Sequence, residues 1–333
     1  MKRVYVVVDK FLTEEDSWET HLTSLLAGYV DSKGLKDVIV EELTDLSTTK
    51  IYFETKYFNA SDVFVFTNSW TNMIPYIKHW SELYKTPVKM LGLWPRSCSI
   101  NLDAEYRPMK DRNWRKVHER ANFRCLEKSF FINEHFKEQF RIYVSKQVFP
   151  ERLHVSSFPL DYLALETSFV KDKYYKQNSI IFPWEKYSKL EENMVYDFVR
   201  VFKDKSFNVI FAQEYNPMGR EQLINQLSRA KVAFLPYNCP NIGKEIYECL
   251  LLETIPMVPD FEAFHNLVPE EFRYPPEWTE SIFNYSAHGF ELTGKLEKLV
   301  TDYENYVDIL KSKREVVTQT IFNSQQLIDE IFD

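Results

Sequence analysis

The sequence predicts an α/β protein built from two doubly wound domains. Three observations lead to this fold class. Patterns typical of strands and of helices alternate along the chain, which favours parallel sheets covered by helices. Residues 3–8 (RVYVVV) and 62–67 (DVFVFT) are near-continuous apolar runs, as in strands that are buried on both faces. Finally, 333 residues are long for one domain and suit two domains of about 150 residues.

In the first half, apolar β-rich runs alternate with stretches of helical periodicity. The expected strands are residues 3–8, 37–43, 62–67, 88–94, 129–133 and, less regularly, 153–158. The expected helices are about 18–30, 72–84, 112–126 and 134–144. In such sheets ligands bind beyond the carboxyl ends of the strands. The positions of interest there are Asp9, Asn68 with Ser69, Trp94 to Ser97, and Asn133 with Glu134.

The second half repeats the alternation after an aperiodic connection at residues 159–178. Strands are expected at 179–182, 208–212, 231–237 and 257–259, and helices at 191–202, 220–228, 243–253, 292–311 and 316–332. The proline-rich stretch from 260 to 278 is expected to be irregular. We therefore divide the chain into domains at residues 1–160 and 161–310, followed by a C-terminal segment at 311–333.

Composition indicates an ordinary globular protein, with 44% hydrophobic and 27% charged residues. A net charge of −8 argues against a generally cationic nucleic-acid binder. The four cysteines form no C-x-x-C pair, and no apolar stretch approaches the roughly 18 residues that a membrane span requires. We expect a soluble cytoplasmic protein, located in the host cytoplasm if the chain comes from a phage. The oligomeric state is left open.

Several common functional classes find no support. No Gly-x-Gly-x-x-Gly follows the first strand, and the sequence has no Walker A motif and no Gly-x-Ser-x-Gly elbow. The seven histidines are scattered and form no His-Glu-x-x-His pair. These observations disfavour a dinucleotide-binding domain, a P-loop NTPase, a serine hydrolase and a metal site.

The most informative stretch is 231–260 (KVAFLPYNCPNIGKEIYECLLLETIPMVPD), which reads as strand, loop, helix, turn and strand. A loop that brings a helix N-terminus to the carboxyl end of a strand forms an anion site. Glu248, about one and a half turns into that helix, is placed to accept both hydroxyls of a ribose whose diphosphate rests on the helix tip. The alternative is that Glu248 is an ordinary surface residue.

The run from Glu248 to Thr254-Ile255-Pro256-Met-Val resembles the nucleotide-sugar motif of GT-B glycosyltransferases, including GT4 and exostosin-like enzymes and bacteriophage DNA glycosyltransferases. The resemblance covers about 25 residues well. It implies two Rossmann-like domains facing a central cleft, a C-terminal helix that crosses back to the first domain, and metal-independent sugar transfer without a cofactor. Two positions depart from the family pattern. Pro240 replaces the first Glu of the Glu-x7-Glu pair, and Glu253 replaces the usual Gly, so only the ribose contact is carried over, to Glu248.

The resemblance also implies a donor site for a nucleotide sugar, with a UDP-sugar favoured. The loop after the strand at 179–182 occupies the place of the family's diphosphate-binding cations, and the loop from Gln213 lies near the donor base. The predicted donor-binding residues are Glu248, Lys186, Lys189, Gly243, Lys244, Ile242, Tyr237 and Gln213.

A second notable segment is 107–124 (RPMKDRNWRKVHERANFR), which has seven basic and two acidic residues and hence a local charge of +5. It could bind phosphates, with an aromatic side chain for a base or a sugar face. The predicted acceptor- or DNA-binding residues are Arg107, Lys110, Arg112, Trp114, Arg115 and Lys116. The alternative is a solvated helix face with Trp114 turned to the core.

Sugar transfer requires stabilisation of the departing diphosphate and, if configuration inverts, a base for the acceptor hydroxyl. Asp9, Asp103 and Glu105 are the candidate bases, and the strand that ends at Trp94 is followed by Pro95 and Arg96 where inverting phage enzymes carry an Asp. This favours a retaining enzyme. Three functions stay open: a glycosyltransferase acting on hydroxymethylated bases in phage DNA, one acting on cell-surface glycans or lipid-linked acceptors, and a catalytically inert GT-B binding module.

Overall fold

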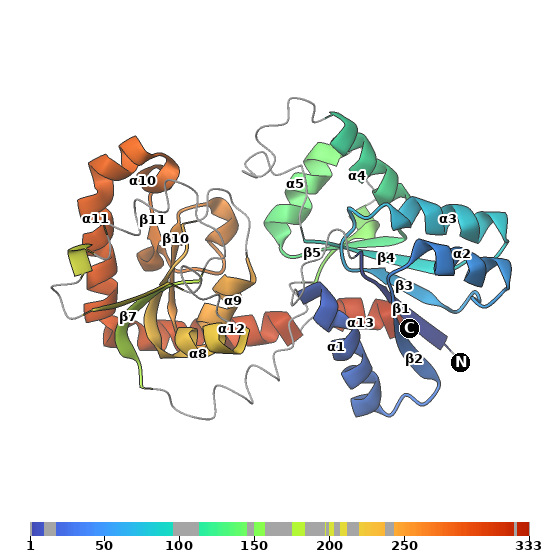
Figure 1. Cartoon of the computed structure of the whole chain (residues 1–333), viewed down its shortest axis with the longest axis horizontal. Coiled ribbons are helices and arrows are strands. Elements are labelled where there is room, and N and C mark those ends of the chain that lie inside the picture. Colours follow the sequence, from blue (N-terminus) through green and yellow to red (C-terminus); the bar gives the residue numbers. More distant parts are fainter. Residues whose placement is uncertain are drawn as a thin grey trace. The chain divides into compact units, whose positions relative to one another are not determined.

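The computed structural model describes residues 2–9, 18–95, 113–144, 150–156, 175–183, 197, 200–202, 207–211, 220–236, 243–322 and 325–332. These residues form two compact units (Figure 1). Unit 1 holds the described residues of Met1–Asn101, Glu105–Asp161 and Thr320–Asp333, and unit 2 holds those of Tyr162–Gln319. The chain therefore enters unit 2 in its second half and returns to unit 1 at its C-terminus.

Unit 1 is built on a six-stranded parallel sheet with the order β2-β1-β3-β4-β5-β6. Its strands are β1 (Lys2–Val7), β2 (Val38–Leu43), β3 (Val63–Phe66), β4 (Lys89–Trp94), β5 (Lys128–Phe131) and β6 (Leu153–Val155). Residues from Val4 to Val7 and all of β3 are buried, as expected for strands covered on both faces. The order reverses between β1 and β3, which makes their carboxyl ends the switch point of this sheet.

Five helices connect these strands: α1 (Trp18–Lys33), α2 (Leu46–Glu54), α3 (Met73–Leu83), α4 (Asn113–Cys125) and α5 (Glu134–Val144). Figure 1 shows α2 and α3 on the face of the sheet opposite to α1. The sequence analysis missed α2. This helix begins at Asp45, whose carboxylate accepts a hydrogen bond of 2.6 Å from the Thr48 amide, and it buries Phe53 against Phe58 and Phe64.

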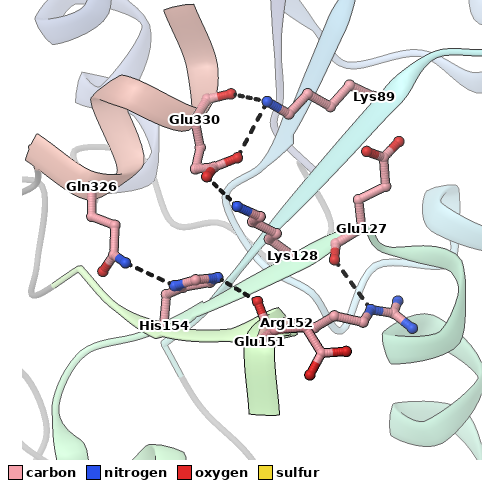
Figure 2. A network of polar contacts seen from close by, with 8 residues as sticks. All are labelled: Lys89, Glu127, Lys128, Glu151, Arg152, His154, Gln326 and Glu330. Atoms are coloured by element: carbon pink, nitrogen blue, oxygen red, sulfur yellow. Dashed lines mark hydrogen bonds and ion pairs between the residues drawn. The ribbon is translucent and has the colours of Figure 1, made fainter. Parts of the chain in front are cut away.

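The C-terminal helix α13 (Gln325–Phe332) belongs to unit 1, as predicted. Figure 2 shows its anchor: the Glu330 carboxylate pairs with Lys89 and Lys128, which begin β4 and β5. Gln326 donates a hydrogen bond of 2.9 Å to His154 on β6, and the Phe332 ring stacks on Tyr29 of α1. Burial and the nearby Lys128 lower the pKa of His154, so its neutral ring accepts this bond. The anchor lies at the amino ends of the strands, away from the switch point.

Unit 2 is built on a second parallel sheet of five strands with the order β11-β10-β9-β7-β8. The strands are β7 (Gln177–Phe182), β8 (Asn208–Phe211), β9 (Ala230–Phe234), β10 (Ile255–Pro259) and β11 (Arg273–Tyr274). Figure 1 shows α8 (Arg220–Arg229) and α9 (Lys244–Leu251) on one side of this sheet and α11 (Ile282–Thr301) on the other. Two doubly wound parallel sheets therefore confirm the predicted fold class.

The last third of the chain differs in detail from the prediction. In place of the expected helix at 292–311, α11 ends at Thr301. A 3-10 turn at Tyr303–Tyr306 and α12 (Val307–Phe322) follow. α11 begins ten residues early because the Ser281 hydroxyl accepts a hydrogen bond from the Asn284 amide and so caps the helix. The helix expected at 316–332 is divided between α12 and α13. The stretch from 260 to 278, expected to be irregular, contains β11 and the short helix α10 (Glu277–Glu280).

Candidate functional site

The switch point of unit 2 lies between β7 and β9, where the strand order reverses. The last residues of β7, β8 and β9 are phenylalanines whose rings pack together. The Phe182 ring centroid lies 4.8 Å from that of Phe211 and 5.6 Å from that of Phe234. After β9 the chain continues to Gly243, an extended residue that precedes the first turn of α9. The N-terminus of α9 is thereby brought to the carboxyl edge of the sheet, where its amides and dipole favour an anion.

Helix α9 is buried on almost every side, and its most unusual residue is Glu248. The residues Ile246, Tyr247, Cys249 and Leu250 are buried, and Glu248 itself is 0% exposed. The alternative that Glu248 is an ordinary surface residue is therefore wrong. Removing a carboxylate from water is costly unless it is paired or hydrogen-bonded, so a buried glutamate near the switch point is a candidate for a ligand-binding residue.

The neighbouring thiol of Cys249 has no nucleophilic character. Burial, together with the charge of Glu248, raises its pKa well above the usual value, so it stays protonated. Burial also raises the pKa of the Tyr247 phenol. Among the described side chains of α9, Glu248 is thus the fully buried carboxylate, and its chemistry suits a polar ligand.

The turn after α9 is held by Thr254 and by a half-buried lysine, Lys176. The Thr254 hydroxyl donates a hydrogen bond of 2.5 Å to the Leu227 carbonyl at the end of α8. Lys176, which lies just before β7, donates to the Thr254 hydroxyl (2.8 Å) and to the carbonyls of Leu252 (2.8 Å) and Ala230 (3.0 Å). Burial lowers the pKa of Lys176 to about 7. The Thr of the Thr-Ile-Pro run is therefore structural: it fixes the turn after α9 to α8 and to the start of β9.

Glu253 stands where the resembled motif has Gly, and its backbone explains that preference. Its φ is +54°, in the left-handed region, and the Thr254 and Glu253 amides close the helix end on the carbonyls of Cys249 (2.8 Å) and Leu250 (3.3 Å). The carboxylate of Glu253 accepts a hydrogen bond of 3.0 Å from Arg314 on α12. The departure from Gly thus joins the turn to α12.

In unit 1, Asp9 lies at the switch point, two residues after the end of β1. It is half-buried, and its carboxylate accepts a hydrogen bond of 2.6 Å from the hydroxyl of Thr71, a buried residue in the loop between β3 and α3. Asn68 and Ser69 of the same loop are also buried, and Ser69 donates to the Leu93 carbonyl at 2.7 Å. A carboxylate therefore lies where an open α/β sheet binds its ligands.

Helix α4 supports this loop from outside. The Asn122 amide donates to the carbonyls of Ser69 (2.8 Å) and Thr71 (3.1 Å), and the His118 ring nitrogen lies 2.8 Å from the Trp70 carbonyl. The sequence analysis assigned no role to these residues or to Lys176. Their partners are 48 to 78 residues away in the chain, so no local pattern could have identified them.

Many predicted site residues lie outside the described residues. These are the candidate bases Asp103 and Glu105, the donor-binding residues Lys186, Lys189, Gln213, Tyr237 and Ile242, and the basic residues Arg107, Lys110 and Arg112. Lys244 begins α9, and its side chain is also outside the described part.

The other three predicted acceptor-binding residues lie on α4 and differ in exposure. Trp114 is 53% exposed, Lys116 is half-buried, and Arg115 is only 3% exposed, with its guanidinium carbon 5.5 Å from the centroid of the Trp114 ring. The alternative in which Trp114 turns to the core is therefore wrong, whereas Arg115 offers almost no surface to a polyanion.

Within the described ranges, no group of three or more His, Cys, Asp or Glu side chains could hold a metal ion. In the same part of the chain, every helix is too short or too polar to cross a membrane.

No protein-family model and no curated protein matches this sequence. Solved structures do match. Sucrose-phosphate synthase from Thermosynechococcus elongatus aligns over 99% of this chain and 100% of its own, with a TM-score of 0.57 and 11% identity. A trehalose-6-phosphate synthase, solved in a study of glycosyltransfer with retention, aligns over 97% and 99%, with a TM-score of 0.58 and 7% identity. The chain has the GT-B fold.

A third match is the pneumococcal O-GlcNAc transferase GtfA in complex with UDP and GlcNAc, with a TM-score of 0.56 and 11% identity. It aligns over 85% of this chain, which spans only 60% of that protein. The GT-B fold accounts for the two parallel sheets and for the C-terminal helix that returns to unit 1. At these identities the likeness extends to the fold, and the residues of the site have to be judged by their own geometry.

Proposed function

We propose that this chain is a glycosyltransferase that moves a sugar from a UDP-sugar to a hydroxyl acceptor with retention of configuration. The observation that carries the proposal is the fully buried carboxylate of Glu248 on α9, which follows the switch-point strand β9 in a GT-B fold. Two of the proteins named above support the proposal. One is complexed with UDP, which supports the donor class, and another was studied for transfer with retention, which supports the stereochemistry.

In this proposal, each group at the carboxyl edge of the unit 2 sheet has a separate role. The N-terminus of α9, preceded by Gly243, receives the diphosphate, and the Glu248 carboxylate accepts hydrogen bonds from the ribose hydroxyls. Lys186 and Lys189 remain the proposed cations for the leaving diphosphate, and Gln213, Tyr237, Ile242 and Lys244 complete the proposed donor site. Stabilising the departing charge in this way is electrostatic catalysis.

Retention also changes the role that the candidate bases would have. A retaining reaction needs no protein base to take the acceptor proton when the leaving phosphate can accept it. Asp9, held by Thr71, is then proposed to orient the acceptor hydroxyl. Asp103 and Glu105 stay predicted as further carboxylates for the acceptor hydroxyl.

The donor site is tested by titrating UDP into the full-length protein by calorimetry. We expect Glu248→Gln to weaken UDP binding ten- to a hundredfold, because a charge-assisted hydrogen bond contributes about 1.5–3 kcal/mol. Glutamine keeps the shape of the side chain, so the melting temperature serves as the folding check. Glu291→Gln, at an exposed position on α11, is the control and should bind UDP as the parent does. Unchanged UDP affinity in folded Glu248→Gln would contradict the proposed donor site.

The acceptor is tested in a second step, with UDP-sugars and several acceptors analysed by mass spectrometry. A hydroxymethylated base in duplex DNA is the acceptor that the basic segment predicted, and the exposed Arg120 and Arg124 on α4 favour keeping it in the screen. Glycans and lipid-linked glycans are the other candidates. Activity that survives EDTA would support the predicted metal independence. Donor binding without any transfer would favour the inert module.

A further inference from the structure

Helix α11 packs one face on the unit 2 sheet and leaves two phenylalanine rings on its other face. Its inner side includes Tyr285, Leu292 and Leu296, which are buried, and the helix contacts β7 and β9. On the outer side, Phe283 is 84% and Phe290 is 89% exposed. An isolated apolar residue on a surface is ordinary, but these two are about two helical turns apart and lie on one line along the helix. The two rings therefore belong to one exposed patch.

The residues between and after the two rings are small. Ala287 and Gly294 are exposed, and each follows one of the phenylalanines by four positions. The Ser286 hydroxyl, also on the outer side, donates a hydrogen bond of 2.8 Å to a backbone carbonyl one turn earlier. Between positions 282 and 290 the sequence has no Asp, Glu, Lys or Arg. We call this line of alternating large and small residues, Phe283, Ala287, Phe290 and Gly294, the α11 stripe.

The order of large and small residues makes the α11 stripe complementary to a second copy of itself. Where two identical helices lie antiparallel across a twofold axis, two positions are level with each other when their midpoint lies on the axis. Positions 283 and 294 have the same midpoint as positions 287 and 290, between 288 and 289. About an axis at this midpoint, each phenyl ring is level with an alanine or a glycine of the other copy, which leaves room for the ring. Parallel helices would instead set ring level with ring.

Helix geometry and charge favour the antiparallel arrangement. The seven-residue spacing suits helices that lie nearly side by side, and small residues at the contact allow the two axes to approach closely. Antiparallel helices also bring the positive N-terminal end of one beside the negative C-terminal end of the other. The exposed Glu280 directly precedes the Ser281 cap of α11, and the exposed Lys298 is in its last turn, so the pairing brings these opposite charges to the same end. Glu297, beside Lys298, is half-buried and already has a partner within the chain.

The area of the patch indicates a weak dimer. With roughly 200 Å² for a phenylalanine side chain, the two rings expose roughly 350 Å². Ile282, Ala287 and Gly294 extend the patch to roughly 450 Å², so a pair would bury roughly 900 Å², less than the roughly 1,200–2,000 Å² of stable complexes. The net charge of −8 and the exposed Glu291 beside the stripe disfavour a nucleic acid or an anionic lipid surface as the occupant.

We propose that two copies of this chain pair through α11, antiparallel across a twofold axis that lies level with the His288–Gly289 peptide. Each phenyl ring of the α11 stripe is then level with an alanine or a glycine of the second copy. The pairing is reversible, with a dissociation constant on the order of 10–100 µM, as suits an interface of this size. It lies on unit 2 and does not depend on the proposed sugar transfer.

Sedimentation velocity of the full-length protein, from about 1 to about 300 µM, tests whether it dimerises. We expect the sedimentation coefficient of the parent to rise with concentration. Phe290→Ala should weaken the dimer by about tenfold or more, because aromatic residues near the centre of an interface contribute much of its affinity. Phe283→Ala with Phe290→Ala should leave a monomer throughout. Leu83→Ala, which removes an apolar side chain that is 57% exposed on α3, is the control and should dimerise as the parent does.

Filling the gaps between the rings distinguishes specific pairing from general apolar association. Ala287→Leu and Gly294→Leu both make the stripe more apolar, and a Cβ at Gly294 meets nothing within 4 Å in the chain itself. In the proposed pair, each leucine occupies space that a ring needs, so each substitution should weaken the dimer about tenfold. Non-specific association would instead become stronger. Unchanged melting temperatures are expected for all these variants and are checked first, because the side chains are exposed.

Cysteine cross-linking tests the register. At a rise of 1.5 Å per residue, the two copies of position 287 differ in height by roughly 4–5 Å, and those of position 294 by roughly 16 Å. A disulfide joins Cα atoms that are roughly 4.4–6.8 Å apart, so the first pair is within its reach and the second is not. Mild oxidation should therefore cross-link two chains of Ala287→Cys. Gly294→Cys should form no more dimer than the parent with its four native cysteines.

Several outcomes would overturn the proposal. These are a monomer at every concentration, a dimer that survives Phe283→Ala with Phe290→Ala, tighter association of the leucine variants, and equal cross-linking at positions 287 and 294. Flotation of a monomeric parent with phosphatidylcholine vesicles that is lost in the double alanine variant would assign the stripe to a lipid surface instead. None of these outcomes bears on UDP binding at Glu248, so failure here is distinguishable from failure of the proposed function.

Discussion

The left-handed backbone at Glu253 predicts that substitution by glycine leaves the protein more stable than substitution by alanine. Both Glu253→Ala and Glu253→Gly delete the carboxylate that pairs with Arg314, a pair whose side chains are 28% and 23% exposed. The loss of this pair is therefore the same in both variants. What differs is the cost of holding φ at +54°.

The difference can be estimated from general values. A left-handed residue with a Cβ costs roughly 1–2 kcal/mol. Glycine escapes that cost but gives up about 0.4–1 kcal/mol through the greater freedom of its unfolded chain. We therefore expect Glu253→Gly to be more stable than Glu253→Ala by about 0.5–1 kcal/mol. For a domain of this size, that is a difference in melting temperature of about 1–4 °C.

Thermal unfolding of both variants measures this difference, and an ordinary helical position supplies the control. Glu291 lies exposed in the middle of α11, where Gly should be less stable than Ala by about 1 kcal/mol. The sign of the Gly–Ala difference should thus reverse between the two positions. If Ala were as stable as Gly at Glu253, strain would not explain why the resembled motif prefers Gly there.

Two further predictions concern the stability of each unit. Burial lowers the pKa of Lys176 to about 7, whereas a lysine in the unfolded chain has a pKa near 10.5. Between these pH values the unfolded state binds one proton more than the folded state. The free energy of unfolding should therefore rise from pH 7 to about pH 9, by about 1 kcal/mol per pH unit. Urea titrations at several pH values should show this slope in the parent and a smaller slope in Lys176→Met. Equal slopes would mean that groups other than Lys176 cause the pH dependence. In unit 1, a Cβ at Gly92 would lie 2.3 Å from Leu126 Cδ1 and 2.5 Å from Ser69 Oγ, so Gly92→Ala should lower the free energy of unfolding by about 1–3 kcal/mol. Gly28→Ala on α1, where nothing lies within 4 Å, should be neutral or stabilising, and similar melting temperatures for the two variants would refute the packing argument.

The fold was predictable because its main signals are local. Apolar runs such as those of β1 and β3 read directly as buried strands, and their alternation with helical patterns predicted both sheets. The helix α2 was missed because Leu46–Glu54 includes Thr48, Thr49 and Ile51, which are weak helix formers. This helix depends on the Asp45 cap and on packing of Phe53, and the second of these is a tertiary effect.

Candidate site residues could be selected from the sequence only where a short motif marks them. Glu248 could be selected because the Glu-to-Pro spacing and the following strand lie within a dozen residues. Lys176 gave no such signal, since it lies in a stretch without periodicity and its partners are carbonyls 54 and 76 residues away. Asn122 and His118 were invisible for the same reason: each supports the loop at the edge of unit 1 through backbone carbonyls, which any residue could supply.

The contacts around α9 distinguish the residues of the motif that hold the turn from Glu248, for which we propose a role in donor binding. Thr254 and Lys176 fix the turn to α8 and β9, and Glu253 closes the helix and reaches α12, so each has a role in stability. Glu248 is different, because it is a carboxylate at 0% exposure on the helix that follows the switch-point strand β9. Removing a carboxylate from water is costly, and hydrogen bonds from the hydroxyls of a ribose would offset part of that cost. This is the reason that we propose the donor ribose there.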